Sequence, residues 1–267
     1  MNRIGFIGAG QMAKALGSGI AKENKNSISF AIADPNEAAR SSFVELIGEH
    51  SDVEVLNSNQ EVVTNCDIVF LAVKPQFIVA ALDGVDFKST NPLVVSVVAG
   101  FQIFQLERMT ETKRIIRVMP NTPCLIGQGA SALACDSVEK SDLELVLGFL
   151  KSVGKVVQIE ERLMDSVTGL SGSGPAYVFS FIEALIDGAV LTGMGRATAR
   201  ELAIQTVVGA AMMVEQTGEH TAVLRDKVTS PGGTTIAGLK ALEEQAFRDA
   251  VMSAVQAATE RSMELGC

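Results

Sequence analysis

The earliest candidate functional residues in this sequence are Gly8, Gly10 and Ala13. They fit the pattern GxGxxA and directly follow the apolar run Ile4 to Ile7. In that pattern the first glycine permits a tight turn, the second lets the backbone approach a pyrophosphate, and the alanine lets a helix pack closely on a strand. Free N–H groups at the helix start then bind the phosphates. We therefore predict dinucleotide contacts from Gly8, Ala9, Gly10, Gln11 and Met12.

A carboxylate, Asp34, follows the next apolar run about 20 residues beyond the glycine motif, where nucleotide-binding folds read the ribose. It could accept a hydrogen bond from a ribose 2′-OH and would repel a 2′-phosphate. Arg40 is the nearby cation in the sequence. The residue itself therefore predicts that NADH is used appreciably.

Three further loops follow apolar runs that read as strands. Ligands bind outside the carboxyl ends of the strands in a doubly wound sheet, so these loops should line one crevice. The alternative for each loop is a simple turn made rigid by Pro75, Pro120 or Pro123. From them we predict cofactor contacts by Ala72, Val73, Lys74, Pro75, Val98, Ala99 and Asn121.

Two segments in the second half, residues 169–176 and 228–235, are rich in glycine and hydroxyl groups and run into apolar stretches. A helix start with unpaired N–H groups and nearby hydroxyls is suited to binding a carboxylate. The alternative is plain capping by Ser and Thr. Two such segments beside a nucleotide site favour a small anionic substrate.

These residues need a framework, and the first 160 residues alternate β-branched runs with amphipathic segments, as βαβ units do. The pattern predicts an α/β fold in which a Rossmann-like, mostly parallel sheet domain (1–160) precedes an all-helical domain (161–267), with breaks at 172–175, 193–195, 217–218 and 231–233. The predicted strands are 4–7, 28–33, 68–72, 93–98, 115–119, 130–134 and 156–159, and the predicted helices include 12–22, 37–47 and 141–152.

The composition argues against several classes of protein. A net charge of −9 without a basic cluster disfavours nucleic acid as a partner. The apolar runs 68–73 and 93–99 are shorter than the roughly 20 residues of a membrane helix, and the first residues leave no room for a signal peptide. A cytoplasmic location is expected. The four cysteines, Cys66, Cys124, Cys135 and Cys267, lack metal-ligand spacing and are interpreted as structural thiols.

Together, the segments 8–12, 72–75, 117–123, 168–176 and 228–235 resemble pyrroline-5-carboxylate reductase, in order and over essentially the whole chain. The Ser-Pro-Gly-Gly-Thr-Thr loop at 230–235 is the most discriminating part. The resemblance implies a Rossmann domain that carries NADPH or NADH, commonly NADPH, and a helical domain that makes a homodimer, with a decamer of five dimers as the larger assembly.

The resemblance also implies roles for single residues. Thr235 would lie beside the substrate nitrogen as the catalytic hydroxyl. Asn59 and the 72–75 loop would contact the dinucleotide, and Glu161 would lie near the nicotinamide end. Lys227 stands where some members have asparagine. The residues implied to bind the substrate are Ser230, Gly232, Gly233, Thr234 and Thr235.

The scarcity of histidine agrees with an imine substrate. Only His50 and His220 are present, neither in a glycine-rich loop, and both are predicted at the surface. A hydroxy-acid dehydrogenase needs a histidine or lysine to move the alcohol proton. An imine nitrogen can arrive protonated, so a hydrogen-bonding hydroxyl suffices. We therefore expect hydride transfer from nicotinamide C4 to ring C5 of 1-pyrroline-5-carboxylate, which yields L-proline.

Three alternatives remain at this point. A β-hydroxyacid dehydrogenase would need a lysine in the helix after the second glycine motif, and none occurs from Ala176 until Lys227. A catalytically silent NAD(P)-sensing module would need only the first domain. A purely structural oligomer would bind no cofactor.

The stretches 176–191 and 207–214 are apolar enough to need burial, which predicts an obligate homodimer.

Overall fold

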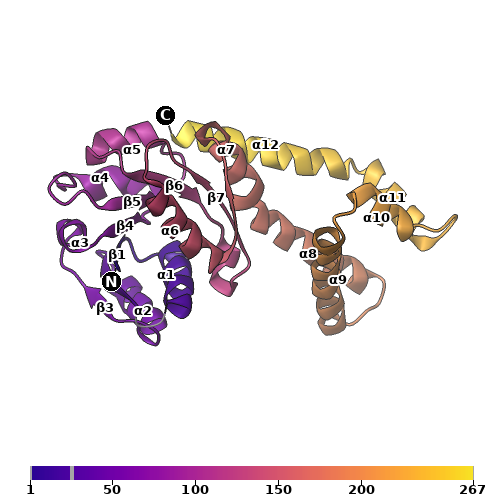
Figure 1. Cartoon of the computed structure of the whole chain (residues 1–267). Helices are drawn as coiled ribbons and strands as arrows, with labels where there is room; N and C mark the ends of the chain where they lie inside the picture. The colour runs from indigo at the N-terminus through magenta and orange to yellow at the C-terminus, as the bar shows by residue number, and fades with distance from the viewer. Residues whose placement is uncertain (1, 25–26, 267) are drawn as a thin grey trace. The chain divides into compact units, whose positions relative to one another are not determined.

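The chain forms two compact units in a computed structural model that describes residues 2–24 and 27–266. One unit comprises Met1–Ser173 with Gln256–Cys267, and the other comprises Gly174–Val255. Figure 1 labels helices and strands of both units and colours the chain from its N-terminus to its C-terminus. The predicted domain boundary at residue 160 falls inside the first unit, because Met164 is fully buried among residues that belong to the sheet.

The first unit is built on an eight-stranded sheet with strand order β3-β2-β1-β4-β5-β6-β7-β8. All neighbouring strands are parallel except β6 and β7, so the prediction of a mostly parallel sheet is confirmed. The three-residue β3 was not predicted, because it is too short to show a period and is partly exposed. The strands are β1 (Asn2–Ile7), β2 (Ile28–Ala33), β3 (Val53–Val55), β4 (Ile68–Leu71), β5 (Leu93–Ser96), β6 (Ile115–Met119), β7 (Gly129–Ala134) and β8 (Gly154–Gln158).

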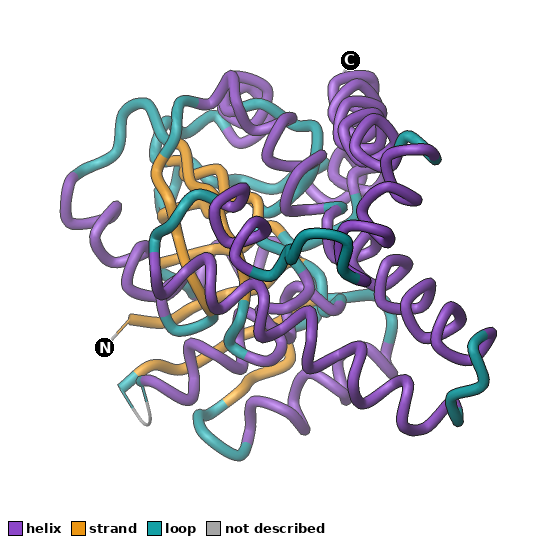
Figure 2. Tube along the Cα trace, turned by 90° about the vertical axis from the view of Figure 1, so that its right-hand side faces the viewer, coloured by secondary structure: helices purple, strands orange, loops and turns teal. Residues whose placement is uncertain are grey.

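Helices cover both faces of this sheet (Figure 2). One face packs on α1 (Gln11–Glu23), α2 (Glu37–Gly48) and α6 (Lys140–Lys151), through side chains such as Phe6 and Leu16. The other packs on α3 (Asn59–Asn65), α4 (Ile78–Leu82) and α5 (Ile103–Thr110). Successive strand residues point to opposite faces of the sheet, and helices cover both faces. Residues on both faces must therefore be apolar, which is why the strands appear in the sequence as continuous apolar runs. The short elements α3, α4 and α5 were not predicted.

The remaining parts of the first unit are short helical segments and the end of the last helix. They are the 3-10 helices η1 (Pro75–Phe77), η2 (Thr122–Ile126) and η3 (Glu161–Leu163), then α7 (Met164–Val167), the π-helix η4 (Thr168–Gly172) and the last part of α12 (Phe247–Leu265).

The second unit is entirely helical, as predicted, and consists of α8 (Gly174–Leu191), α9 (Arg196–Thr217), α10 (Thr221–Lys227), α11 (Thr234–Glu244) and the first part of α12. Helices α8 and α12 are joined by the Tyr177 hydroxyl, which donates to the Ala254 carbonyl at 3.3 Å, and by the ring pair Phe181–Phe247. Within residues 174–255, the only buried hydrophobic residues are Ala199 and Ala203. This unit therefore has almost no core of its own.

The predicted break at residues 172–175 is wrong. Residues 161–191 form one helical run of 31 residues that passes through η4 without a turn. By length and composition alone this run is apolar enough to cross a membrane, so the sequence argument that every apolar stretch is too short does not hold for it. None of its most apolar window is buried within the chain. Hydroxyl groups explain the misreading, because Thr168 Oγ1 donates to the Met164 carbonyl and Ser171 Oγ to the Val167 carbonyl inside the helix.

Candidate active site

The loop between β1 and α1 lies tightly against the ends of two neighbouring strands. Gly8 has φ +102°, a conformation that favours glycine, and its N–H donates to the Ala33 carbonyl at 2.8 Å. A Cβ at Gly8 would lie 2.7 Å from the Ala72 carbonyl oxygen. Space and backbone conformation therefore both require glycine here, as the motif predicts.

The second glycine of the motif faces open space instead. Gly10 is the N-cap of α1, and an added Cβ would meet no heavy atom of the described residues within 4 Å. No side chain of the described residues caps this helix. Its first N–H groups, on Gln11, Met12 and Ala13, therefore lack an intrahelical acceptor. The loop offers both the space and the donors that a dinucleotide pyrophosphate needs, so it fits the expected cofactor.

The Asp34 carboxylate is already hydrogen-bonded to the protein backbone. Its Oδ2 accepts from the Ala9 N–H at 2.7 Å, and its Oδ1 accepts from the Asn36 N–H at 2.8 Å. Arg40 Nη1 donates to the Asp34 carbonyl at 2.5 Å, which places this cation at the end of β2. A second cation, Lys14, donates to Ser42 Oγ at 3.2 Å between α1 and α2, and the sequence reading overlooked it. Asp34 thus fixes the glycine loop, and a carboxylate keeps further lone pairs for a ribose hydroxyl.

Other residues predicted to contact the cofactor, namely 72–75 and 98–99, follow the carboxyl ends of β4 and β5. Ala72 N–H donates to the Ile7 carbonyl at 2.9 Å, which continues the sheet, while Val73 and Pro75 are half-buried and Lys74 is exposed. Ala99 is half-buried, but Val98 is only 1% exposed, so any cofactor contact there is left to its backbone. Asn59 Nδ2 donates to the Ala81 carbonyl at 2.8 Å, which ties α3 to α4.

Asn121 has a structural partner that the sequence did not reveal. Its Oδ1 accepts from the Ala130 N–H at 2.9 Å, and its Nδ2 donates to the Ser171 carbonyl at 3.0 Å. Pro175, four residues after Ser171, has no N–H to donate to that carbonyl. The Asn121 amide takes the place of the missing helix donor. It thereby links the loop after β6 to the π-helix η4.

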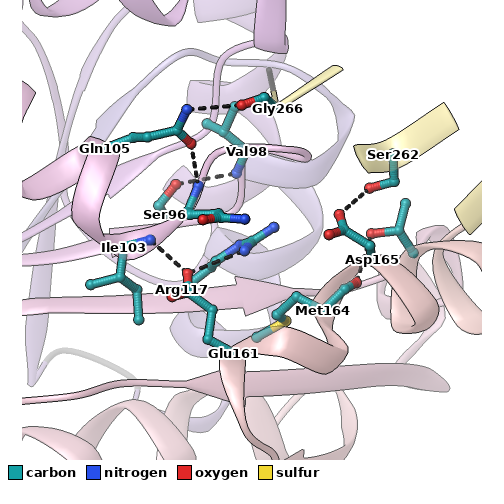
Figure 3. Close-up of polar contacts among 12 residues, drawn as sticks. Ser96, Val98, Ile103, Gln105, Arg117, Glu161, Met164, Asp165, Ser262 and Gly266 are labelled. Carbon is teal, nitrogen blue, oxygen red and sulfur yellow. Dashed lines mark hydrogen bonds and ion pairs between the residues drawn. The ribbon is translucent and has the colours of Figure 1, made fainter. Parts of the chain in front are cut away.

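Glu161 lies in a polar cluster with a buried cation (Figure 3). Its Oε1 accepts from the Ile103 N–H at 2.5 Å and from Arg117 Nη1 at 3.2 Å. The Arg117 side chain is 2% exposed, and among the described residues its Nε and Nη2 have no hydrogen-bond partner. Arg117 belongs to the segment 117–123 that carries part of the family resemblance, but no function was predicted for it from the sequence. An arginine in the middle of a buried strand, where apolar residues belong, is the signal that could have singled it out.

The predicted substrate loop of the second unit forms a tight turn that enters α11. Gly232 has φ +66°, and a Cβ at Gly233 would overlap the Ser230 hydroxyl. Gly233 is the N-cap, without a side-chain cap from any described residue, so the first N–H groups of α11 stay available. Thr234 is exposed, and Thr235 is half-buried in the first helical turn. Lys227, at the variable position, forms an ion pair with Glu219 at 2.6 Å.

One histidine caps a helix, and the three described cysteines are buried or half-buried. His220 Nδ1 accepts from the Ala222 N–H at 3.2 Å and caps α10, while His50 is half-buried. Burial raises the pKa of Cys66 to about 11 and also raises the pKa of Cys124 and Cys135. Cys267 lies outside the described residues. Across residues 2–24 and 27–266, no group of three or more His, Cys, Asp or Glu is placed to hold a metal ion.

Comparison with known proteins covers both units. Residues 161–265 match the family model for pyrroline-5-carboxylate reductase dimerisation, and residues 3–100 match the model for coenzyme F420-dependent NADP oxidoreductases. The chain is 43% identical to a pyrroline-5-carboxylate reductase of Synechocystis, over 99% of this chain and 98% of that protein. It is 43% identical to one from Arabidopsis thaliana, over 98% of this chain and 95% of that protein.

A solved structure gives the same result. The pyrroline carboxylate reductase of Plasmodium falciparum with NADP bound superposes with a TM-score of 0.88 at 36% identity, over 100% of this chain and 98% of that one. With the full-length relatives, this agreement in sequence and fold decides the assignment. The chain belongs to the pyrroline-5-carboxylate reductase family.

Proposed function

We propose that this protein catalyses the NAD(P)H-dependent reduction of 1-pyrroline-5-carboxylate to L-proline, the last step of proline biosynthesis. The observation that carries the proposal is the family relationship over nearly the whole chain, which includes the dinucleotide-binding and the dimerisation segments. The open space at Gly10 and the donors at the start of α1 support cofactor binding independently.

In the first unit, the residues proposed to hold NADPH or NADH are Gly8, Ala9, Gly10, Gln11, Met12, Asp34, Asn59, Ala72, Val73, Lys74, Pro75, Val98, Ala99, Asn121 and Glu161. When bound, the reduced nicotinamide supplies the hydride that reaches C5 of the ring. The protein supplies orientation, which can account for a large part of the rate of such a transfer. Asp34 contributes by fixing the Ala9 amide, and Glu161 by fixing the start of α5.

In the second unit, Ser230, Gly232, Gly233 and Thr234 are proposed to hold the substrate carboxylate. The free N–H groups at the start of α11 and the partial positive charge of a helix start suit an anion. The Thr235 hydroxyl would donate a hydrogen bond to, or accept one from, the ring nitrogen, according to its protonation. No histidine or lysine is needed, because the imine is electrophilic once protonated.

We also propose that residues 1–160 and 161–267 are the functional divisions, since the dimerisation model starts at residue 161. The nearly coreless second unit supports a homodimer, and the resemblance to the family supports a decamer of five dimers. The long apolar helical run is then covered by a partner chain and not by lipid. The net charge of −9 argues against a nucleic acid partner. A cytoplasmic location is part of the same proposal.

The test follows NADPH or NADH oxidation by absorbance after 1-pyrroline-5-carboxylate is added, with L-proline identified as the product. Turnover with proline formation is the expected outcome. Reduction of NAD(P)+ by β-hydroxyacids, without NAD(P)H oxidation by 1-pyrroline-5-carboxylate, would favour the dehydrogenase alternative. Cofactor binding without turnover of either substrate would favour an NAD(P)-sensing module.

A further inference from the structure

The last turn of α12 and the residue after it, together residues 262–266, pack back onto the sheet unit to which they belong. Ser262 is 2% exposed, and its hydroxyl donates to Asp165 Oδ1 at 2.7 Å. Gln105, in the first turn of α5, donates from Nε2 to the Gly266 carbonyl at 2.8 Å. Figure 3 shows both bonds beside the Arg117–Glu161 pair. We call residues 262–266 the closing turn.

The closing turn meets the loop between β5 and α5 backbone to backbone. A Cβ at Gly266 would overlap the Gly100 carbonyl oxygen, and a Cβ at Gly100 would lie 3.1 Å from the Gly266 N. Gly100 also has φ +84°. The two glycines therefore allow a close approach that no side chain would permit at either position.

The same β5–α5 loop is fixed from two other directions. Glu161 accepts from the Ile103 N–H at the start of α5, while the buried Arg117 holds that carboxylate. Gln105 Oε1 accepts from the Gln102 N–H at 2.8 Å, so one amide both caps α5 and bonds to the closing turn. Residues 97–102 are thus held between the sheet, the Arg117–Glu161 pair and the closing turn.

The position of this loop indicates which part of a cofactor it would serve. The glycine loop follows β1, and Asp34 and Arg40 lie at the end of β2 on one side of it. The β5–α5 loop lies on the other side, beyond β4. In a doubly wound sheet the adenosine half of a dinucleotide lies towards β2, so the nicotinamide half extends towards β4 and β5.

We infer that the closing turn is a positioning element for the nicotinamide end of the cofactor. It contacts no reacting atom, and it acts by fixing the backbone of residues 97–102. The inference rests on the proposed NAD(P)H function. The loop lies on the nicotinamide side of the cofactor, so loosening it should weaken binding of the nicotinamide end and spare binding of the adenosine half. Small displacements of a reacting geometry also have large effects on rate.

The first experiment compares Gly266→Ala with Gly148→Ala. The added Cβ overlaps Gly100 in the first variant, whereas Gly148 lies on the exposed side of α6 with no atom of the described residues near its added Cβ. NADPH affinity is measured by nicotinamide fluorescence, and the affinity for 2′-phospho-ADP-ribose, which lacks the nicotinamide, by competition. For Gly266→Ala we expect a Kd for NADPH raised about 10-fold and a Kd for 2′-phospho-ADP-ribose within about twofold of wild type. Equal weakening of both ligands, or of neither, would overturn the inference.

A second variant, Gln105→Glu, removes the bond to the closing turn while it keeps an acceptor for the Gln102 N–H. It should likewise raise the Kd for NADPH and leave the Kd for 2′-phospho-ADP-ribose near the wild-type value, with an unfolding temperature close to wild type. Wild-type affinity for NADPH in Gln105→Glu would overturn the inference even if Gly266→Ala fails to fold. Both experiments measure binding constants and not turnover. If the protein binds NADPH but does not reduce 1-pyrroline-5-carboxylate, the proposed function is refuted, while the inference on the closing turn can still be tested.

Discussion

At the scale of single residues, Asp34 shows that one carboxylate can have two possible functions. Its position after β2 predicts a ribose contact that favours NADH, while the family resemblance favours NADPH. In the structure, its two oxygens accept from the Ala9 and Asn36 amides, so the side chain also fixes the glycine loop. The two functions can be separated because one depends on charge and the other on a hydrogen-bond acceptor.

We predict that NADH is used appreciably and that Asp34→Ser shifts the preference towards NADPH. Removal of a negative charge beside a 2′-phosphate should change the ratio of kcat/KM for NADPH over NADH by about 10-fold. Steady-state kinetics with both cofactors measure this ratio.

Asp34→Asn is the matched control, because it removes the charge and keeps one oxygen that can accept from either the Ala9 or the Asn36 N–H. It should shift the ratio as Asp34→Ser does, with less loss of affinity for both cofactors. If the wild type strongly prefers NADPH and neither substitution alters that preference, Asp34 does not contact the ribose in a way that selects the cofactor.

Thr235 carries the second prediction at this scale. Thr235→Val keeps the shape and removes the hydroxyl, so a role in the transition state predicts that kcat and kcat/KM both fall by roughly 10- to 100-fold. A mere helix cap would instead lose about 1 kcal/mol of stability and leave kcat nearly intact. The structure argues against the cap, because the N-cap of α11 is Gly233 and no side chain of the described residues caps this helix.

Kinetics and thermal unfolding of the folded Thr235→Val protein therefore give different results for the two roles. Near-wild-type turnover would remove Thr235 from the mechanism. Imine activation would then be left to the substrate's own protonation or to a bound water.

At the scale of elements, the β1–α1 loop contains two glycines with different requirements. Gly8 is constrained by φ +102° and by the Ala72 carbonyl, whereas Gly10 has an ordinary φ of −69° and open space around it. The fold requires the first glycine. The expected cofactor requires the second, since a Cβ there would occupy space that the pyrophosphate needs.

We therefore predict different outcomes for the two alanine variants. Gly8→Ala should lower the free energy of unfolding by about 2 kcal/mol or more, through backbone strain and overlap. Gly10→Ala should unfold like wild type but bind NADPH at least about 10-fold more weakly. Chemical denaturation and fluorescence titration measure the two quantities. Unchanged NADPH affinity in Gly10→Ala would show that the pyrophosphate does not lie against this loop.

At the scale of the whole molecule, the second unit cannot account for its own stability as a single chain. Only Ala199 and Ala203 are buried hydrophobic residues within 174–255, while α8 exposes large side chains such as Phe179 (63%) and Leu191 (88%). Apolar surface of this extent marks an interface. Since residues 161–265 match a dimerisation model, a second copy of the chain is the expected cover.

We predict an obligate homodimer or a larger assembly of dimers at micromolar concentration, measured by sedimentation. Phe179→Asp should weaken the assembly and lower activity, because it places a charge in an apolar interface. Leu46→Asp, on the exposed side of α2 in the other unit, is the control and should leave the assembly unchanged. A stable, active wild-type monomer would contradict the prediction.

Local sequence pattern accounts for part of this structure. The glycine loop, the limits of β2 and β6, and the helical second half follow from turn chemistry, apolar runs and the loss of strand signal. The short elements β3, α3, α4 and α5 have too few residues to show a period, and the hydroxyl groups at 168–173 resemble a turn although they bond within a helix. The family resemblance supplied the substrate.

Contacts between groups far apart in the sequence could not be predicted and are seen in the folded chain. It showed that Asp34 fixes Ala9, that Asn121 replaces the helix donor missing at Pro175, and that Gln105 binds the Gly266 carbonyl 161 residues away. A buried hydrogen-bonding group must find a partner, but its own sequence neighbourhood does not say which one. That choice is made when the sheet and its helices pack, because packing determines which donors and acceptors lie within reach.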